Sequence, residues 1–78
     1  VKIKDFKFVP KEIRVKKGTT IIWRNEDSAP HTVESSDGQY TSDNLENTDE
    51  VQFTFDKAGT VDYICGIHPS MKGSVIVE

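Results

Sequence analysis

The sequence predicts an all-β domain, and three observations lead to this expectation. Apolar residues occur in short runs that alternate with polar residues at a period of two, turn residues separate these runs at regular intervals, and nothing indicates a long helix. A chain of 78 residues is enough for one domain, although at this size folding buries only about 60 to 65% of the surface of the unfolded chain. We therefore expect a single β-sandwich or barrel over residues 1–78.

The first expected strand contains a change of phase. The expected strands cover residues 1–8, 13–15, 19–24, 32–35, 51–55, 61–65 and 74–77. In the first, Val1 and Ile3 are odd-numbered whereas Phe6 and Phe8 are even-numbered, so these side chains cannot share one face of a regular strand. Because an extra residue in a strand reverses the faces that follow it, we expect a β-bulge at Asp5.

Turns and a polar loop delimit the strands in the middle of the chain. Lys17-Gly18 and Asp37-Gly38 are typical of turns, because glycine adopts a positive φ without steric cost. The segment Tyr40–Glu50 is polar and acidic, with Leu45 as an apolar anchor. We expect this segment to form a loop.

The last strands have the clearest pattern. Apolar residues alternate with polar ones through residues 51–55, and Ala58-Gly59 is expected to form the following turn. Val61, Tyr63 and Cys65 then lie at a spacing of two, so they share one face of the next strand. We therefore expect Cys65 to point inward, at the end of the core.

Composition and charge exclude several classes of function. The net charge of −3 disfavours nucleic acid as a partner. Residues 1–20 carry seven Lys or Arg against two acidic residues, whereas the remainder carries three basic against eleven acidic residues; the simplest interpretation is that both segments form solvated strand faces and loops. The single Cys excludes an internal disulfide, and no run of about eighteen apolar residues is present to span a membrane.

Four residues form a candidate metal site. Cys65, His68 and Met71 follow one another as Cys-x-x-His-x-x-Met, and His31 stands far upstream after Pro30. They include the only Cys, the only Met and both His of the chain. Two imidazoles, one thiolate and a weak axial thioether are the ligands of a mononuclear copper electron-transfer site. Each residue taken singly has a simpler structural interpretation, but their joint spacing favours a type 1 copper site with one ion per chain.

Other uses of these residues are less well supported. Structural zinc sites usually contain two to four Cys, and attachment of a c-type haem requires Cys-x-x-Cys-His. A catalytic Cys65–His68 pair would need an oxyanion hole and a residue that orients the histidine, and neither is evident in the sequence. Zinc remains an adventitious alternative to copper at the same residues.

The chain resembles the cupredoxins, and most closely the small amicyanin and plastocyanin group. The resemblance rests on residues 6–10, 15–20, 23–25, 30–33 and 63–71. It implies a Greek-key β-sandwich that carries single electrons and is not an enzyme. It also implies that His31, Cys65, His68 and Met71 are the copper ligands, with His68 nearest the surface. The two residues between His68 and Met71 match the short amicyanin loop.

Two departures from these relatives concern the ligand loop. Ile67 occupies the position of a proline before the second ligand His, so its N–H is free, and we expect it to donate to Cys65 Sγ. Thr32 and Gly66 replace an Asn and a Ser or Thr that hydrogen-bond across the loops. We expect this connection to be weaker here or to run through the backbone.

The resemblance also leads to expectations about partners and location. Larger redox proteins, as donor and acceptor, would dock transiently near His68, and the acidic stretch Asp43–Glu50 would steer a basic partner. We expect a monomer in a periplasmic or other extracytoplasmic setting, and whether a membrane tether belongs to the full-length protein is left open. Two alternatives also remain: a module for copper delivery or storage, and the electron-entry domain of a larger copper oxidase or reductase.

Overall fold

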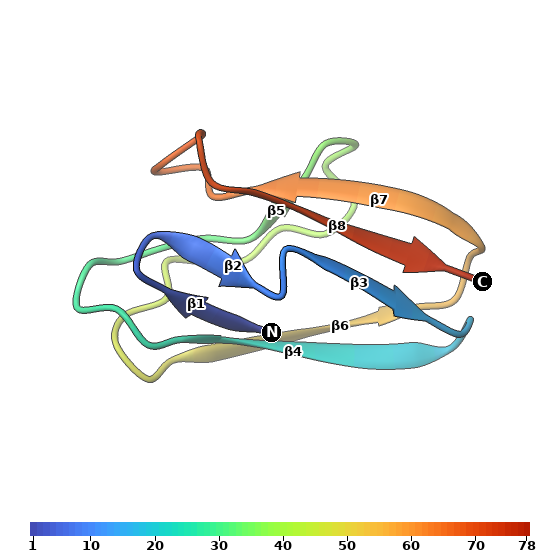
Figure 1. The fold of residues 1–78 in the computed structure, drawn as a ribbon, viewed down its shortest axis with the longest axis horizontal. Coiled ribbons are helices and arrows are strands. Elements are labelled where there is room, and N and C mark those ends of the chain that lie inside the picture. Colours follow the sequence, from blue (N-terminus) through green and yellow to red (C-terminus); the bar gives the residue numbers. More distant parts are fainter.

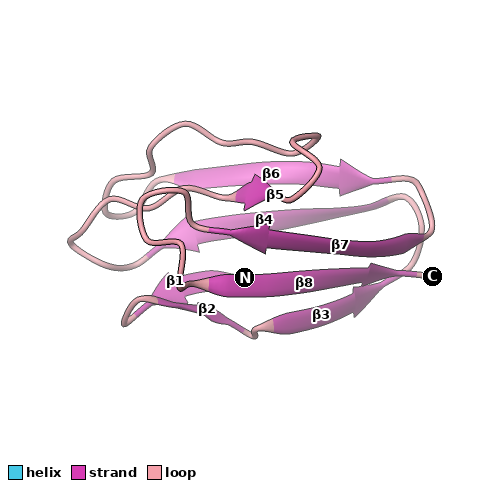
Figure 2. Ribbon diagram, turned by 90° about the horizontal axis from the view of Figure 1, so that it is seen from above, coloured by secondary structure: helices cyan, strands magenta, loops and turns pink.

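Eight β-strands and no helices make up the computed structural model, which describes all 78 residues. The strands are β1 (Lys2–Lys4), β2 (Lys7–Val9), β3 (Glu12–Val15), β4 (Thr19–Asn25), β5 (Glu34–Ser35), β6 (Glu50–Phe55), β7 (Gly59–Ile64) and β8 (Lys72–Val77). They form two layers, with loops gathered at both ends (Figures 1 and 2). The prediction of an all-β sandwich is confirmed.

Each layer is a four-stranded sheet. The strand order is β2-β1-β4-β6 in one sheet and β3-β8-β7-β5 in the other. The chain crosses between the sheets several times, and the pairs β1–β4 and β3–β8 are parallel while the other pairs are antiparallel. Burial alternates along β4, where Ile21, Trp23 and Asn25 face the core. The period of two along β4 thus places these three side chains on the same, inward face.

The expected first strand is wrong in one respect, because residues 1–8 form a hairpin. Lys2–Lys4 and Lys7–Val9 are two antiparallel strands joined by a two-residue turn, and Ile3 lies opposite Phe8. Asp5 and Phe6 both adopt left-handed conformations, with φ of 54° and 57°. Two consecutive positive φ values are typical of the turns that join two-residue hairpins. The change of phase therefore marks a reversal of the chain and not a bulge.

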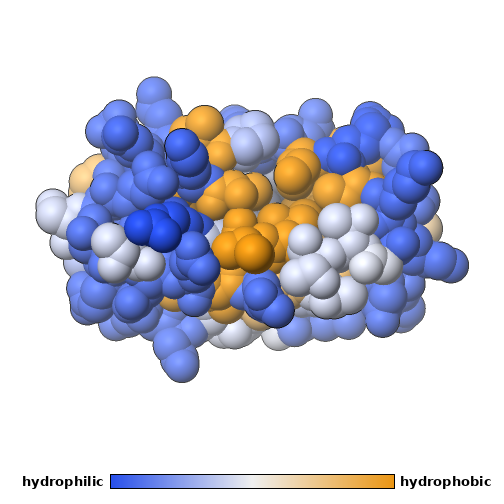
Figure 3. Space-filling model, turned by 90° about the horizontal axis from the view of Figure 1, so that it is seen from below, coloured by the Kyte–Doolittle hydropathy of each residue, from blue (hydrophilic) through white to orange (hydrophobic).

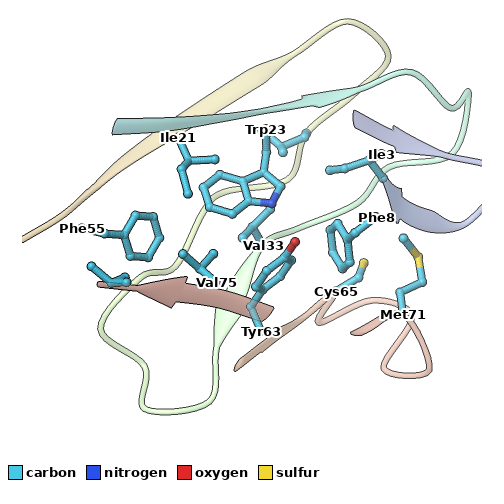
Figure 4. Close-up of a cluster of buried hydrophobic side chains, with 12 residues drawn as sticks. Ile3, Phe8, Ile21, Trp23, Val33, Phe55, Tyr63, Cys65, Met71 and Val75 are labelled. Carbon is cyan, nitrogen blue, oxygen red and sulfur yellow. The ribbon is translucent and has the colours of Figure 1, made fainter. Parts of the chain in front are cut away.

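The core lies between the sheets and is rich in aromatic residues. The largest buried side chain is that of Trp23, and its ring packs edge-on against that of Tyr63, with centroids 5.4 Å apart. The indole N–H of Trp23 and the hydroxyl of Tyr63 are both buried without a hydrogen-bond partner, and Figure 4 shows these two polar atoms turned toward each other. Cys65 and Met71 lie together at one end of this cluster (Figure 4).

One face of the molecule carries exposed apolar side chains. Viewed from below, the middle of the molecule is hydrophobic and is surrounded by hydrophilic side chains (Figure 3). Val9 and Ile22, on β2 and β4, are among the exposed large apolar residues, at 49% and 47% exposure. No segment forms a long apolar helix that could traverse a lipid bilayer.

The topology brings two distant segments to the same end of the sandwich. The connection from β7 to β8 contains Cys65, His68 and Met71, whereas His31 lies between β4 of one sheet and β5 of the other. The backbone of His31 exchanges two hydrogen bonds with that of Leu45, which is buried as the expected anchor of the loop 40–50. His31 is thus held on a connection that joins both sheets.

Candidate metal centre

Three of the four expected ligands meet at one point. Nδ1 of His31 lies 3.6 Å from Cys65 Sγ, and Nδ1 of His68 lies 3.8 Å from the same sulfur. The three candidate ligand atoms all lie within 4.8 Å of one another. His31 and Cys65 are completely buried, while His68 is half-buried. One sulfur and two ring nitrogens therefore surround a space that suits a single ion.

The short loop after β7 holds its side chains in place through its own backbone. The N–H of Cys65 donates to the carbonyl of Met71 at 3.1 Å, and the N–H of Met71 donates to that of His68 at 2.9 Å. Tyr63 and Cys65 are both buried, so the register of β7 does aim Cys65 inward. Met71 is buried as well, and its sulfur lies at the same end of the core as that of Cys65 (Figure 4).

Asp27 orients the ring of His31. The distance between His31 Nε2 and Asp27 Oδ2 is 2.9 Å. With the proton on Nε2, the ring donates to this carboxylate and its Nδ1 lone pair faces Cys65 Sγ. Metal-binding histidines commonly donate their second N–H in this way, which fixes both the tautomer and the ring orientation. Sequence analysis did not identify Asp27, although an acidic residue four positions before His31 was an available signal.

The same carboxylate holds the tip of the β1–β2 hairpin. The N–H of Asp5 donates to Asp27 Oδ1 at 2.7 Å, and the N–H of Phe6 donates to Oδ2 at 3.0 Å. Burial alone would raise the pKa of Asp27. The two backbone hydrogen bonds, together with the hydrogen bond from the His31 side chain and its electrostatic attraction, instead hold this pKa below its ordinary value. Asp27 is therefore ionised at neutral pH and connects the hairpin to the candidate site.

Phe6 covers both histidines. Its ring packs edge-to-face against His31, with centroids 5.1 Å apart, and against His68 at 4.9 Å. The other side of the ring is open, since Phe6 is 49% exposed. A positive φ is unfavourable for a bulky residue, and such strain persists only where the surroundings enforce it. The hydrogen bonds to Asp27 and the contacts with the two imidazoles supply that enforcement here.

Thr32, and not Ile67, supplies the N–H that faces the thiol sulfur. The Thr32 N–H lies 3.4 Å from Cys65 Sγ, and Ile67 forms no such hydrogen bond. The expectation for Ile67 is therefore wrong, because the donor comes from the segment that follows His31. The expected connection between Thr32 and Gly66 does run through the backbone, since the Gly66 N–H donates to Thr32 Oγ1 at 2.8 Å.

Thr32 is itself fixed, and Gly66 has little space around it. Thr32 Oγ1 donates to Glu34 Oε2 at 2.8 Å, so one hydroxyl joins the ligand loop to β5. A Cβ at position 66 would overlap the Glu34 carboxylate. A glycine at this position therefore allows the close approach of the two segments.

His68 is the most accessible of the four candidate residues. His31 and Cys65 are fully buried and Met71 is only 4% exposed, whereas His68 is half-buried beneath Phe6. The neighbouring Ile67 and Pro69 are exposed, while Ala29 and Pro30 are only partly so. Any group that approaches the site from solvent therefore meets His68, Phe6 and Ile67 first.

The donor set fits copper. A thiol that receives an N–H hydrogen bond, two imidazoles and a thioether are the soft and borderline donors that copper accepts in both of its oxidation states. A carboxylate that orients one imidazole is the outer arrangement usual for such ligands. Structural zinc sites, by contrast, usually contain two to four thiolates, and this chain has one.

Comparisons with known proteins agree with the fold and with this site. A sequence model of the cupredoxin-like domain matches residues 1–77. Amicyanin-alpha of Methylorubrum extorquens is 37% identical over the whole chain, which spans 70% of that protein. Amicyanin of Paracoccus denitrificans is 35% identical, and the chain spans 63% of it. Halocyanin of Natronomonas pharaonis is 41% identical over 94% of the chain, which spans 49% of that protein.

Solved structures show the same similarity in three dimensions. A Cu(I) form of an amicyanin point mutant superimposes with a TM-score of 0.95 at 36% identity, and covers 100% of this chain and 79% of its own. An oxidised amicyanin mutant gives a TM-score of 0.94 at 34% identity with the same coverage. This chain therefore belongs to the cupredoxin-like family and is similar within it to the amicyanins.

Proposed function

We propose that this chain is a type 1 copper electron carrier, and not an enzyme, which binds one copper ion through His31, Cys65, His68 and Met71. The observation that carries this proposal is the convergence of two Nδ1 atoms on the only thiol of the chain, within 4.8 Å of one another. The similarity to amicyanins solved in Cu(I) and oxidised forms supports the choice of metal.

The residues of the site are suited to electron transfer because hydrogen bonds restrain them. Bound copper would supply a one-electron couple between Cu(II) and Cu(I). Asp27 accepts a hydrogen bond from the His31 ring and so fixes its orientation. The N–H of Thr32 donates to Cys65 Sγ, and its hydroxyl donates to Glu34. Hydrogen bonds of the loop backbone hold Met71 in place. Ligands held in this way keep their arrangement when the charge at the site changes.

The burial of the four candidate ligands also controls how solvent and partner proteins reach the metal site. The buried His31, Cys65 and Met71 exclude water from three sides, and the half-buried His68 is the route to the surface. We therefore propose that donor and acceptor proteins dock transiently near His68. We further propose that residues 1–78 form one domain, that the protein is a monomer and that it works in a periplasmic or other extracytoplasmic compartment.

Spectroscopy of the copper-loaded protein tests the site. Addition of Cu(II) should produce an intense visible absorption band from thiolate-to-copper charge transfer and an EPR spectrum with narrow copper hyperfine splitting. Cys65→Ser should abolish both, whereas Ser70→Ala, in the same loop but at an exposed position, should leave them unchanged. A colourless wild-type complex would overturn the proposal and favour copper delivery or zinc binding.

A further inference from the structure

A hollow lies beside the ligand loop and opens to solvent. Its volume is about 280 Å³, and Met71 and Phe6 form part of its wall. Phe6 is the residue that also touches His31 and His68. A group seated in this hollow is therefore separated from the candidate metal site by one aromatic ring on one side and by the expected axial ligand on the other.

Three lysines give this hollow its charge. Lys7 lies on β2, Lys11 follows that strand and Lys72 begins β8. The strands β2 and β8 belong to different sheets but contact each other. No carboxylate is among the lining residues, and none of the three ammonium groups forms an ion pair. We call this hollow, defined by Lys7, Lys11 and Lys72 with Phe6 and Met71, the lysine pocket.

A second hollow continues the lysine pocket along β8 and shares Lys11 and Lys72 with it. The carboxylate that lines the second hollow, Asp62, is already engaged, because the hydroxyl of Ser74 donates to it at 2.8 Å. Asp62 lies outside the lysine pocket and forms no ion pair with Lys11 or Lys72. Asp5 lies on the hairpin next to Phe6, but it is not among the residues that line the pocket.

The local charge is opposite to that of the whole chain. The net charge is −3, and the loop 40–50, which contacts the backbone of His31 through Leu45, contains three acidic residues before β6 begins. The metal-binding end thus has an acidic loop against His31 and a basic pocket against Met71. A partner with the complementary arrangement of charges would be oriented as well as attracted.

We propose that the lysine pocket receives carboxylate side chains from an acidic surface of the electron-transfer partner, an inference that rests on the proposed function. Lysine ammonium groups are flexible, strongly hydrated point charges, so they attract carboxylates without holding them in one rigid geometry. Small redox encounters rely on such steering and bury little surface. The docked surface would face Phe6, which contacts both imidazoles.

Electron-transfer kinetics with two small reagents of opposite charge test the pocket. The Cu(I) protein would be oxidised by hexacyanoferrate(III), which is anionic, and by tris(phenanthroline)cobalt(III), which is cationic. The triple variant Lys7→Gln, Lys11→Gln, Lys72→Gln should react roughly tenfold more slowly with the anion at low ionic strength, and no more slowly with the cation. Added salt should remove the difference.

A second triple variant provides the matched control. Lys16→Gln, Lys17→Gln, Lys57→Gln makes the same change in net charge at the opposite end of the sandwich. There the backbone N–H of Lys17 donates to the carbonyl of Glu78, and Lys57 follows β6. It should slow the reaction with the anion by less than about twofold. Equal effects of the two triple variants would overturn the proposal, because only the total charge would then matter.

Binding can also be measured without copper. Hexaglutamate added to the metal-free protein should shift the amide resonances of Lys7, Ser70 and Lys72 in ¹H–¹⁵N spectra, and the pocket variant should show no shifts. If inorganic phosphate binds as tightly as hexaglutamate, the pocket is a simple anion site and the proposal fails. If hexaglutamate binds but the copper spectrum is not of type 1, the pocket stands and the proposed function fails.

Discussion

Asp27→Asn is expected to weaken the fold and the metal site together. In the wild type the carboxylate accepts three hydrogen bonds, from the N–H groups of Asp5 and Phe6 and from the His31 ring. The side chain is only 11% exposed, so water cannot replace all of them. An asparagine keeps one carbonyl oxygen, but its NH₂ group would face a donor. Its neutral oxygen also accepts more weakly than a carboxylate does.

The magnitude follows from these contacts. Two of the three donors are exposed backbone N–H groups and only the His31 donor is buried, so loss of about two of these hydrogen bonds should lower the free energy of unfolding of the metal-free protein by about 1 to 2 kcal/mol. Removal of a carboxylate that orients a ligand histidine typically weakens metal binding 10- to 100-fold, which is about 1.4 to 2.7 kcal/mol. The reduction potential should rise, because a His31 ring without its carboxylate partner is less basic and stabilises Cu(II) less.

Three measurements check this prediction: urea unfolding of the metal-free protein, Cu(I) affinity from competition with a chelator, and voltammetry. Asp37→Asn is the control, because Asp37 also accepts two hydrogen bonds, from Ser35 and Gln39, but lies in a turn away from the site. It should leave copper affinity and potential unchanged. A Cu(I) affinity of Asp27→Asn within twofold of wild type would show that Asp27 does not position His31.

The pH dependence provides an independent check. The folded pKa of Asp27 lies below its ordinary value of about 3.9, so the ionised group stabilises the fold fully above that value. This stabilisation is lost as the pH falls through the lowered pKa. The Asp27→Asn variant should lack this part of the acid destabilisation, so its unfolding free energy should decline less steeply below pH 4 than that of the wild type.

Other predictions follow from single contacts. Thr32→Val should cost about 1 to 3 kcal/mol in urea unfolding, because it leaves the Gly66 N–H without its acceptor, whereas Thr32→Ser should retain most of the stability. Gly73→Ala should destabilise by about 1 to 3 kcal/mol or prevent folding, because the added Cβ overlaps the Tyr63 ring; a wild-type melting temperature would contradict this. Burial raises the pKa of Tyr63, an effect that the nearby Trp23 indole only partly offsets, so wild-type stability should fall as the pH rises above about 10, and Tyr63→Phe should reduce that fall. Phe6→Leu should lower the melting temperature of the metal-free protein, since an edge-to-face aromatic pair contributes about 0.5 to 1.5 kcal/mol; unchanged melting would show that the ring does not stabilise the site.

The parts of the fold that depend on local alternation could be predicted from the sequence. The strands around Trp23, Phe53 and Val75 have the expected positions, and the spacing of Tyr63 and Cys65 correctly placed the thiol inside. Side-chain direction along a strand follows from the period of two, which needs no knowledge of the partner strand. The ligand loop was recognisable because three of its candidate residues lie within seven positions.

The parts that depend on tertiary contacts could not be predicted. The turn at Asp5 and Phe6 has neither the Gly nor the Asn that usually accompanies positive φ, and its conformation depends on Asp27, which is distant in sequence. The lysine pocket is likewise formed by strands from opposite ends of the chain, so Lys7 and Lys72 give no local signal. The charge of residues 1–20 was noted, but the position of Lys7 and Lys11 next to the site becomes evident only in the fold.

The attachment of the β1–β2 hairpin has a consequence for how a metal ion enters and leaves. β1 pairs with β4 through only two residues, while the tip is secured by the two N–H bonds to Asp27. Short units of this kind open locally more often than the whole fold does. One such opening would uncover both imidazoles and free the His31 ring at the same time. The rate at which this hairpin opens, which the Phe6 amide reports when every opening leads to hydrogen exchange, should therefore set the upper limit for the rate of metal exchange.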